Sequence, residues 1–215
     1  MGTIYKTGRK SKLMSKKNCL IIFTRKPEKG KVKTRLAQGV GDDKALKVYI
    51  YLLKHSAKIT ANVNAHQQVW YTNSIERNDI WNDGIFEKLV QCEGDLGNKM
   101  QFAFEENFKK GFNKVIIIGT DLLDINSEDI EKAFQLLDKH EVVIGPAEDG
   151  GYYLLGMKSI IPELFLNIDW STEHVLEQTL DCLTNKTFAL LDQRNDIDYK
   201  DDALRHAELK KIIEN

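Results

Sequence analysis

Short apolar runs alternate with stretches of helical periodicity along most of the chain. The runs of strand length are 19–24, 67–72, 85–91, 114–118, 141–145, 151–157 and 186–191. The stretches whose apolar residues recur at the three- and four-residue spacing of a helix are 43–61, 97–110, 127–138, 172–184 and 200–212. This alternation predicts an α/β fold, a three-layer α/β/α sandwich with a mixed, mostly parallel sheet.

The link between the predicted strands 141–145 and 151–157 departs from this scheme. It contains proline, glycine and acidic residues and is too short for the helical crossover that parallel strands need. We therefore expect antiparallel pairing at this point. The chain has no internal repeat, low-complexity tract or linker, so we expect a single domain over residues 18–215.

The run 115–118 consists of four β-branched apolar residues, which indicates a strand buried on both faces. A glycine, Thr120 and Asp121 follow it. Ligands of open α/β sheets bind at the carboxyl ends of the strands, and a carboxylate there commonly holds a divalent metal that serves phosphate. We expect Asp121 to be a metal ligand and Thr120 to contact a nucleotide. The alternative is that Asp121 caps the next helix, although Asn126 or Ser127 could begin that helix.

Basic residues crowd the segment that follows the first predicted strand. This is the usual phosphate-binding position of such folds, between the first strand and the first helix. The segment has neither a P-loop nor a dinucleotide-binding fingerprint, so lysine and arginine would neutralise a polyphosphate in place of backbone amides. The alternative is a solvated basic loop. The candidate phosphate-binding residues are Arg25, Lys26, Lys31, Lys33 and Arg35.

A glycine-rich segment, 91–100, leads from a predicted strand into a predicted helix. Asp95, which lies between Gly94 and Gly97, is a candidate to contact a base, a ribose or a metal-bound water. Equally, Asp95 could be a turn acid, with the glycines present only for their positive φ angles.

Two acids lie in the link between the fifth and sixth predicted strands, and two glycines follow them directly. Asp149 is a candidate catalytic residue that orients or deprotonates an acceptor hydroxyl. Gly150 and Gly151 lack side chains where a ligand or neighbouring backbone comes close, and Tyr152 completes this candidate substrate-binding set. Tyr152 and Tyr153 should point to opposite faces of the sheet. The alternative is a tight hairpin turned by Asp149-Gly150.

Two later segments contribute further candidates. Trp170, Ser171 and Thr172 precede a predicted helix, and the two hydroxyl residues are as suitable for capping it as for binding substrate. Asp198 follows the last predicted strand, two residues after Asp196, and is a candidate second metal ligand.

Composition is that of an ordinary soluble globular protein, with 42% hydrophobic and 29% charged residues in 215. No apolar run approaches the length of a membrane span, and the amino terminus has no apolar signal-peptide region. The three cysteines are scattered without metal-ligand spacing, so we expect a reduced, cytoplasmic protein. The serine-nucleophile and His-Glu-x-x-His motifs are absent.

The net charge of −1 conceals an asymmetry. Residues 1–17 contain six basic and no acidic residues, which leaves 25 basic against 32 acidic residues in the rest, about −7. An acidic body argues against nucleic-acid binding. We expect 1–17 to be a disordered basic leader or an artificial extension, with Met14 as an alternative start.

Several short motifs follow one another in an order typical of a known family, and they cover nearly all of 19–206. They are Lys33-Thr34-Arg35-Leu36, Gly94-Asp95-Leu96-Gly97 with Met100, Gly119-Thr120-Asp121, Gly145-Pro146-Ala147 with Asp149-Gly150-Gly151-Tyr152, Trp170-Ser171-Thr172 and Asp196-Ile197-Asp198. Together they resemble the radical-SAM/selenodomain-associated transferases, a branch of the glycosyltransferase-A-like (nucleotide-diphospho-sugar transferase) superfamily. The resemblance implies a nucleotide-binding α/β/α fold and a divalent metal, Mg²⁺ or Mn²⁺, at Asp121. Two departures are Leu123 in place of the usual proline and Asn98-Lys99 in place of an arginine-containing pair.

Our leading hypothesis is transfer from a nucleotide-diphospho-sugar donor to a small-molecule acceptor. Asp121 and Asp198 would hold the metal, and the basic loop would hold the phosphates. The superfamily also contains 2-phospholactate and molybdenum-cofactor guanylyltransferases, which look similar in the basic loop and in the acid after the central strand. Nucleotidyl transfer with release of pyrophosphate is therefore the alternative. A non-catalytic nucleotide-binding module is a third possibility. We expect neither a nucleic-acid partner nor a membrane span.

Overall fold

The computed structural model describes residues 18–214, so the predicted leader 1–17 lies outside the described residues. The strands are β1 (Asn18–Thr24), β2 (His66–Tyr71), β3 (Phe86–Val90), β4 (Lys114–Ile118), β5 (Val142–Pro146), β6 (Tyr152–Met157) and β7 (Phe188–Leu190). The helices are α1 (Thr34–Val40), α2 (Asp42–Thr60), α3 (Leu96–Lys109), α4 (Ser127–Leu136), α5 (Val175–Asp181), α6 (Lys200–Leu204), α7 (Ala207–Glu214) and the 3-10 helix η1 (Pro162–Phe165).

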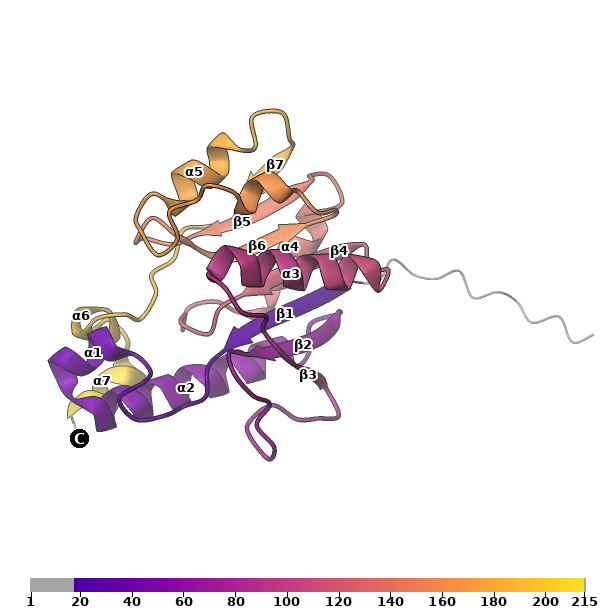
Figure 1. Cartoon of the computed structure of the whole chain (residues 1–215). Coiled ribbons are helices and arrows are strands. Elements are labelled where there is room, and N and C mark those ends of the chain that lie inside the picture. Colours follow the sequence, from indigo (N-terminus) through magenta and orange to yellow (C-terminus); the bar gives the residue numbers. More distant parts are fainter. Residues whose placement is uncertain (1–17, 215) are drawn as a thin grey trace, which may run out of the picture.

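All seven strands belong to one sheet, in the order β3-β2-β1-β4-β6-β5-β7 (Figure 1). Only β6 runs against its neighbours, and the other adjacent strands pair in parallel. The predicted mixed, mostly parallel sheet is confirmed, and so is the antiparallel pairing of β5 with β6. The short link forces it, because a chain that reverses within a few residues can only return antiparallel.

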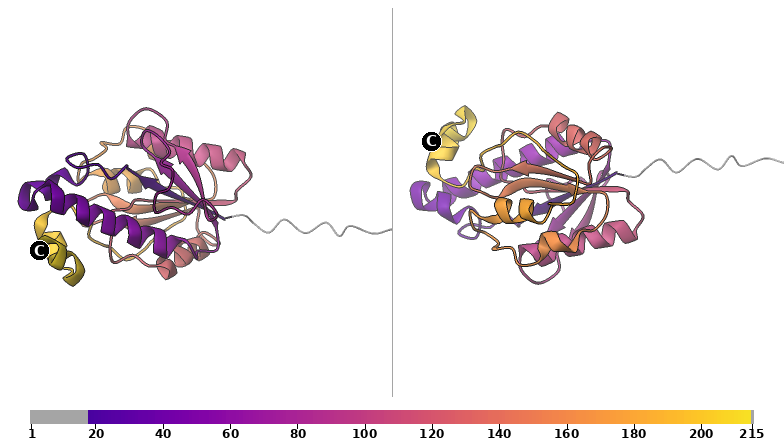
Figure 2. Two further views of the ribbon diagram at one scale, coloured as in Figure 1. Left: turned by 90° about the horizontal axis from the view of Figure 1, so that it is seen from below. Right: turned by 90° about the horizontal axis from the view of Figure 1, so that it is seen from above.

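Helices cover both faces of the sheet, as the two views along its plane show (Figure 2). Alternate side chains of the central strands enter different cores, so both faces of these strands are buried and apolar. In β4, Ile116 and Ile118 join the core beneath α2 and α4, whereas Val115 and Ile117 join the core beneath α3 and η1. The predicted α/β/α sandwich is thereby confirmed.

A third apolar cluster lies beside the sheet and joins α1 and α2 to the carboxyl-terminal helices (Figure 1). It includes Leu36, Leu52, Ile197 and Leu209. Two helix predictions were wrong here. The short helix α1 lies in a segment predicted to be loop, because it buries only Leu36 and so shows no apolar stripe. The predicted helix 200–212 is two helices, α6 and α7.

The strand order defines a topological switch point between β1 and β4. From β1 the chain passes through α1 and α2 to β2 on one side, whereas from β4 it passes through α4 to β5 on the other. The two loops therefore diverge at the carboxyl ends of these strands, which is where ligands of open α/β sheets bind.

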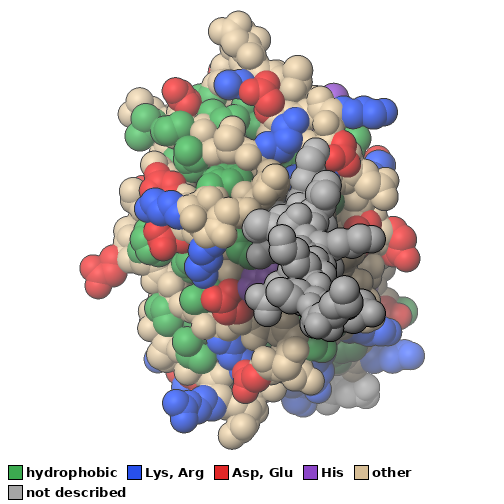
Figure 3. All heavy atoms as spheres, turned by 90° about the vertical axis from the view of Figure 1, so that its right-hand side faces the viewer, with side chains coloured by type: hydrophobic (Ala, Val, Ile, Leu, Met, Phe, Trp, Pro, Cys, Tyr) green, Lys and Arg blue, Asp and Glu red, His purple; other side chains and the backbone are tan. Residues whose placement is uncertain are grey.

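The opposite edge, where the amino ends of the parallel strands lie, faces the viewer in Figure 3. On the coloured part of this face, basic and acidic side chains are interspersed rather than gathered by sign. Among residues 18–214, no helix has the length and apolarity needed to span a bilayer.

Candidate functional site

The fold brings every sequence-predicted segment to one edge of the sheet. The basic loop follows β1, Asp95 lies in the loop after β3, Asp121 in the loop after β4, and Asp198 in the segment after β7. Asp149 lies in the β5–β6 turn, which opens at the same edge because β6 is antiparallel. Segments far apart in the chain thus meet around the switch point between β1 and β4.

A lysine between two carboxylates forms the centre of this site. Lys33 Nζ lies 2.5 Å from Asp121 Oδ1 and 3.0 Å from Asp198 Oδ1, and the lysine side chain is only 5% exposed. Burial alone would lower the pKa of Lys33, but the charges of Asp121 and Asp198 outweigh it and raise the pKa. The ammonium group therefore stays charged, and it neutralises the two carboxylates between which it lies.

The backbone at Lys33 is strained. This residue precedes the first turn of α1 with φ 48° and ψ 46°, in the left-handed region that side chains other than asparagine and aspartate rarely adopt. Such strain persists where surrounding contacts determine the conformation, and it is common at functional sites. The contacts of Lys33 with Asp121 and Asp198 hold the residue in this conformation.

Arg35 extends the cluster on the solvent side. Its Nη1 lies 3.1 Å from Asp198 Oδ2, and its guanidinium carbon lies 6.0 Å from the centre of the Tyr199 ring. Asp198 therefore accepts from two basic side chains of the same loop, Lys33 and Arg35. The structure brings these two predicted phosphate-binding residues together.

The other predicted basic residues lie differently. Lys26 pairs with Glu76 and Lys31 pairs with Glu28, at 3.0 and 2.7 Å, so both are neutralised outside the Lys33 cluster. Arg25 is exposed, and among the described residues its guanidinium has no ion-pair partner. Its backbone is fixed by Tyr49, whose hydroxyl accepts from the Arg25 N–H at 3.0 Å. Of this loop, Arg25 remains available to a ligand.

Asp196 is a buried carboxyl group that the sequence prediction left out of the site. Burial and, to a smaller extent, the nearby charges of Asp121 and Asp149 together raise its pKa to about 8, although the charge of Lys33 lowers it. Its Oδ1 is buried and has no hydrogen-bond partner. A buried polar atom without a partner is costly, so this oxygen indicates a position built for a ligand. In the sequence, the feature that points to Asp196 is its position two residues before Asp198.

We expect Asp196→Asn to flatten the pH dependence of stability in metal-free protein. Between its ordinary pKa of 3.8 and about 8, Asp196 is protonated in the folded protein but ionised in the unfolded chain. Stability should therefore fall as pH rises through this window, by up to about 1.4 kcal/mol per pH unit from this group. Urea unfolding at pH 5 and pH 8 in the presence of a chelator measures the effect. Equal losses of stability in wild type and variant would contradict it.

Arg194 is a positioning residue that the sequence prediction missed. Its guanidinium donates to the Asp124 carbonyl at 2.6 Å and pairs with Asp129 at 2.7 Å. Its own backbone N–H donates to Pro146 O at 3.1 Å. Arg194 thus ties the loops after β4 and β5 to the segment that carries Asp198. A single arginine in a polar stretch gives no sequence signal of such a role.

The β5–β6 turn is the tight hairpin that the sequence offered as an alternative. Gly150 has φ 86°, and a side chain there would collide with the backbone of Glu173. Asp149 Oδ1 accepts from the Gly151 N–H at 2.9 Å, which fixes the exposed carboxylate at the rim of the site. The turn thus explains Gly150 structurally and leaves Asp149 exposed at the same sheet edge as Asp121.

Tyr152 and Tyr153 point to opposite faces, as predicted. Tyr152 packs against the core beneath α3 and η1, whereas Tyr153 belongs to the other core. Burial raises the pKa of Tyr152 and keeps it neutral. Tyr152 is therefore a packing residue that follows Gly150 and Gly151 in the turn.

Asp95 caps helix α3, a structural role that was not predicted for it from the sequence. Its Oδ1 accepts from the Asn98 N–H at 2.8 Å, which satisfies an N-terminal amide of α3. Gly94 has φ 114°, whereas Gly97 has no positive φ and is small because Trp170 packs against it. The half-buried Trp170 thereby anchors its segment on the first turn of α3.

Ser171 and Thr172 do not cap the helix that follows them. Helix α5 begins at Val175 with His174 as its cap residue. Thr172 Oγ1 donates to Asp169 O at 2.7 Å within the preceding loop, and the exposed Ser171 has φ 67°. The predicted start of this helix at 172 was three residues too early.

One of the two alternatives for Asp121, that it caps the helix after β4, is excluded. The N-cap of α4 is Asn126, whose side chain accepts from the Asp129 N–H. Asp121 therefore does not cap that helix, and its carbonyl accepts from the Ile197 N–H at 2.9 Å. This bond holds the loop of Asp121 next to the segment of Asp198. Thr120 is buried beside them.

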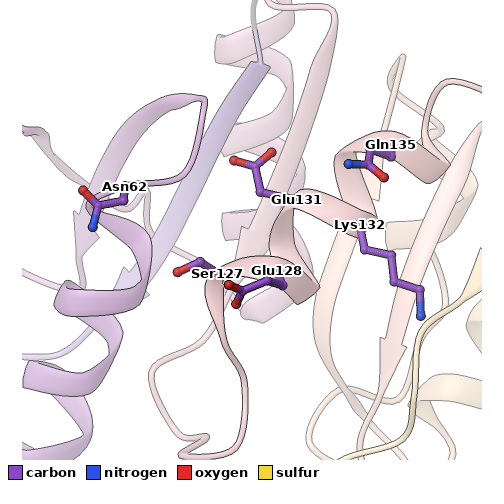
Figure 4. A pocket seen from close by; sticks show the side chains of 6 residues that line it. All are labelled: Asn62, Ser127, Glu128, Glu131, Lys132 and Gln135. Carbon is purple, nitrogen blue, oxygen red and sulfur yellow. The ribbon is translucent and has the colours of Figure 1, made fainter.

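A shallow hollow between the end of α2 and the outer face of α4 has no part in this cluster (Figure 4). Its lining side chains come from both elements and point in different directions rather than to a common centre. It lacks the buried charges found at the strand ends, so we do not take it for the functional site. The lining residues are Asn62, Ser127, Glu128, Glu131, Lys132 and Gln135.

The fold and the strand-end carboxylates place the protein in the class of glycosyltransferase-A-like, Rossmann-type α/β proteins. The chain belongs to the family DUF2064, described as "uncharacterized protein conserved in bacteria", whose model matches residues 55–172. This match includes Asp95, Asp121 and Asp149. No curated protein matches the chain.

Solved structures resemble the whole described chain. A candidate nucleotide-diphospho-sugar transferase from Desulfovibrio desulfuricans G20 is 28% identical, with a TM-score of 0.81 over 92% of this chain and 94% of that one. A 4-diphosphocytidyl-2C-methyl-D-erythritol synthase from Anaerococcus prevotii DSM 20548 is 11% identical, with a TM-score of 0.58 over 91% and 96%. The inositol-1-phosphate CTP transferase from T. maritima is 15% identical, with a TM-score of 0.51 over 93% and 96%. The last two likenesses show the fold alone.

Proposed function

We propose that the protein is a metal-dependent glycosyltransferase that uses a nucleotide-diphospho-sugar donor. The observation that carries this proposal is the cluster of Lys33 between Asp121 and Asp198 at the switch point of the sheet. Carboxylates and a buried lysine at this position suit a ligand that combines a divalent cation with phosphate. The predicted class, a transferase, agrees with the names of the neighbours from D. desulfuricans and T. maritima.

The chemistry of the donor set fits Mg²⁺ or Mn²⁺. Hard divalent cations take oxygen ligands, and Asp121 and Asp198 are the residues that would hold the cation. Asp196, two residues before Asp198, has a buried Oδ1 without a hydrogen-bond partner and would offer a further oxygen once deprotonated. Within residues 18–214, no three acidic, histidine or cysteine side chains already converge as a metal site. We attribute this to Lys33, whose ammonium separates the two carboxylates. When bound, the metal would neutralise charge on the leaving diphosphate.

The basic residues at the cluster favour a diphosphate over a triphosphate. The number of lysines and arginines in the loop would by itself suit a triphosphate. Lys26 and Lys31, however, pair with glutamates away from the cluster. Lys33 and Arg35 pair with Asp121 and Asp198 themselves, so both would turn to phosphate if a metal took these carboxylates. Together with the exposed Arg25, they are the residues that we expect to bind phosphate. Three cations together with a metal match the charge of a nucleoside diphosphate leaving group better than that of a triphosphate.

The acceptor would enter from the β5–β6 side. Asp149 is exposed and held by the Gly151 N–H, so its second oxygen can accept the proton of an acceptor hydroxyl. The turn of Gly150 and Gly151 and the loop of Trp170 border this side. We propose that Ser171 and Thr172, which are exposed there, contact the acceptor, and that Asp95 and Thr120 contact the nucleotide.

We further propose that the protein is akin to the radical-SAM/selenodomain-associated transferases, that it is cytoplasmic, and that residues 18–215 form one domain.

The products of turnover test the proposed function. A thermal-shift screen of nucleoside triphosphates and nucleotide-diphospho-sugars, with and without Mn²⁺, first identifies the stabilising donor, since stabilisation follows affinity for the folded state. The best donor is then incubated with a panel of hydroxyl acceptors. We expect a nucleoside diphosphate to be released. Release of pyrophosphate from a triphosphate would contradict glycosyl transfer and indicate nucleotidyl transfer. Nucleotide binding without any turnover would indicate a non-catalytic module.

A further inference from the structure

Gly119 differs from every other glycine in the described part of the chain. Five of those glycines have a positive φ angle, which a side chain would strain. Each of the remaining ones except Gly119 has an atom within 4 Å of where a Cβ would lie. Gly119 has neither an unusual φ nor any such neighbour, so the ligand-free fold gives no reason for a glycine at this position.

The position of Gly119 supplies a reason. It is the first residue after β4, the central strand next to the switch point, and it is exposed between the buried Ile118 and the buried Thr120. A Cβ built at this position would meet no atom within 4 Å, so open space lies beside it at the carboxyl ends of the strands. Glycine is found where a ligand approaches the backbone closely, because a Cβ would occupy the space of the ligand.

The distance to the carboxylates indicates which part of a ligand lies there. Gly119 precedes Asp121 by two residues, so their Cα atoms are at most about 7 Å apart. If Asp121 lies beside the diphosphate, a group one step further along the donor lies against Gly119. In every nucleotide, the group that follows the phosphates on the side away from the transferred sugar is the ribose.

We propose that the ribose of the nucleotide donor lies in van der Waals contact with the backbone of Gly119, which makes this residue a steric determinant of donor binding. This inference rests on the proposed function, because it requires a nucleotide at the cluster. Gly119 would contribute to donor binding by having no side chain in the space that the ribose occupies. Position 119 could hold alanine or valine without loss of the fold.

A size series at position 119 tests the inference. The variants Gly119→Ala, Gly119→Val and Gly119→Leu are titrated with UDP, GDP, CDP and ADP in Mn²⁺, and their Mn²⁺ affinity is measured separately without nucleotide. We expect unfolding midpoints no lower than wild type, unchanged Mn²⁺ affinity, and nucleotide affinity that falls at least tenfold for valine and further for leucine. Gly84→Val is the control, since Gly84 is exposed, has an ordinary φ and precedes β3 at the opposite edge of the sheet. Its Cβ would approach only the Asn82 side chain, at 3.2 Å.

The outcomes separate this inference from the function on which it rests. If wild type binds a nucleoside diphosphate and Gly119→Val binds it equally well, the steric role is overturned while the proposed donor class stands. If wild type binds none of the four nucleotides, both are overturned. An unfolding midpoint well below that of wild type would show that the fold itself needs the glycine, which also overturns the inference.

Discussion

Replacing Asp121 by asparagine is expected to abolish metal-dependent binding of the nucleotide donor. Asparagine keeps the size of the side chain but removes the charge that a divalent cation requires. A metal stabilises leaving-group charge by several kcal/mol, so donor affinity in Mn²⁺ should fall by at least a hundredfold and turnover should become undetectable. Isothermal titration calorimetry with the stabilising donor, with and without Mn²⁺, measures the change.

Asp124→Asn is the matched control for Asp121→Asn. Asp124 lies three residues further along the same loop, and its side chain is 42% exposed against 45% for Asp121. It faces Arg194 rather than Lys33. The control should retain donor affinity within about threefold, because an exposed ion pair contributes about 1 kcal/mol or less. Undiminished Mn²⁺-dependent donor binding by Asp121→Asn would show that Asp121 is not a metal ligand.

Replacing Lys33 by methionine is expected to have opposite effects on metal and on donor. In metal-free protein the change leaves Asp121 and Asp198 without their shared cation, which should cost about 1–2 kcal/mol of stability. A fully buried pair would cost about 3–5 kcal/mol, but Asp121 is half exposed to solvent. Mn²⁺ should then bind at least as tightly as in wild type, because no lysine competes for the carboxylates. Turnover should fall about 10²- to 10³-fold, because the diphosphate loses a charged donor.

Lys31→Met is the matched control for Lys33→Met. Lys31 belongs to the same loop but is 75% exposed and pairs with Glu28 alone. Its removal should leave Mn²⁺ affinity, stability and turnover nearly unchanged. Chemical denaturation, Mn²⁺ titration and the donor assay give the three readouts. Weaker Mn²⁺ binding by Lys33→Met would show that the lysine supports the metal site rather than occupying it.

The sheet was predictable because its signals are local and strong. The run 115–118 is β-branched throughout, and a buried parallel strand is the structure that uses such a run on both faces. The antiparallel turn of β5 and β6 followed from the length of one link. In contrast, α1 and the break between α6 and α7 have no local signal, because Leu36 is buried by residues distant in sequence.

The candidate site was predictable only as a set of segments at one sheet edge. The rule that ligands bind at the carboxyl ends of strands is enough to place Asp121, Asp149 and Asp198 at the same edge. It could not show that Lys33 would lie between two of them while Lys31 pairs with Glu28, since alternate lysines of one loop look alike in sequence. Nor could it show the burial of Asp196, which depends on the surrounding packing.

The most direct test of the central claim is to locate the metal. Crystals of the protein grown with Mn²⁺ and a nucleoside diphosphate, measured at a wavelength where manganese scatters anomalously, give its position independently of activity. We predict a manganese peak between the carboxylates of Asp121 and Asp198, with the ammonium of Lys33 displaced toward the phosphates. A peak elsewhere, or nucleotide bound with Lys33 still between the two carboxylates and no manganese beside them, would contradict the account.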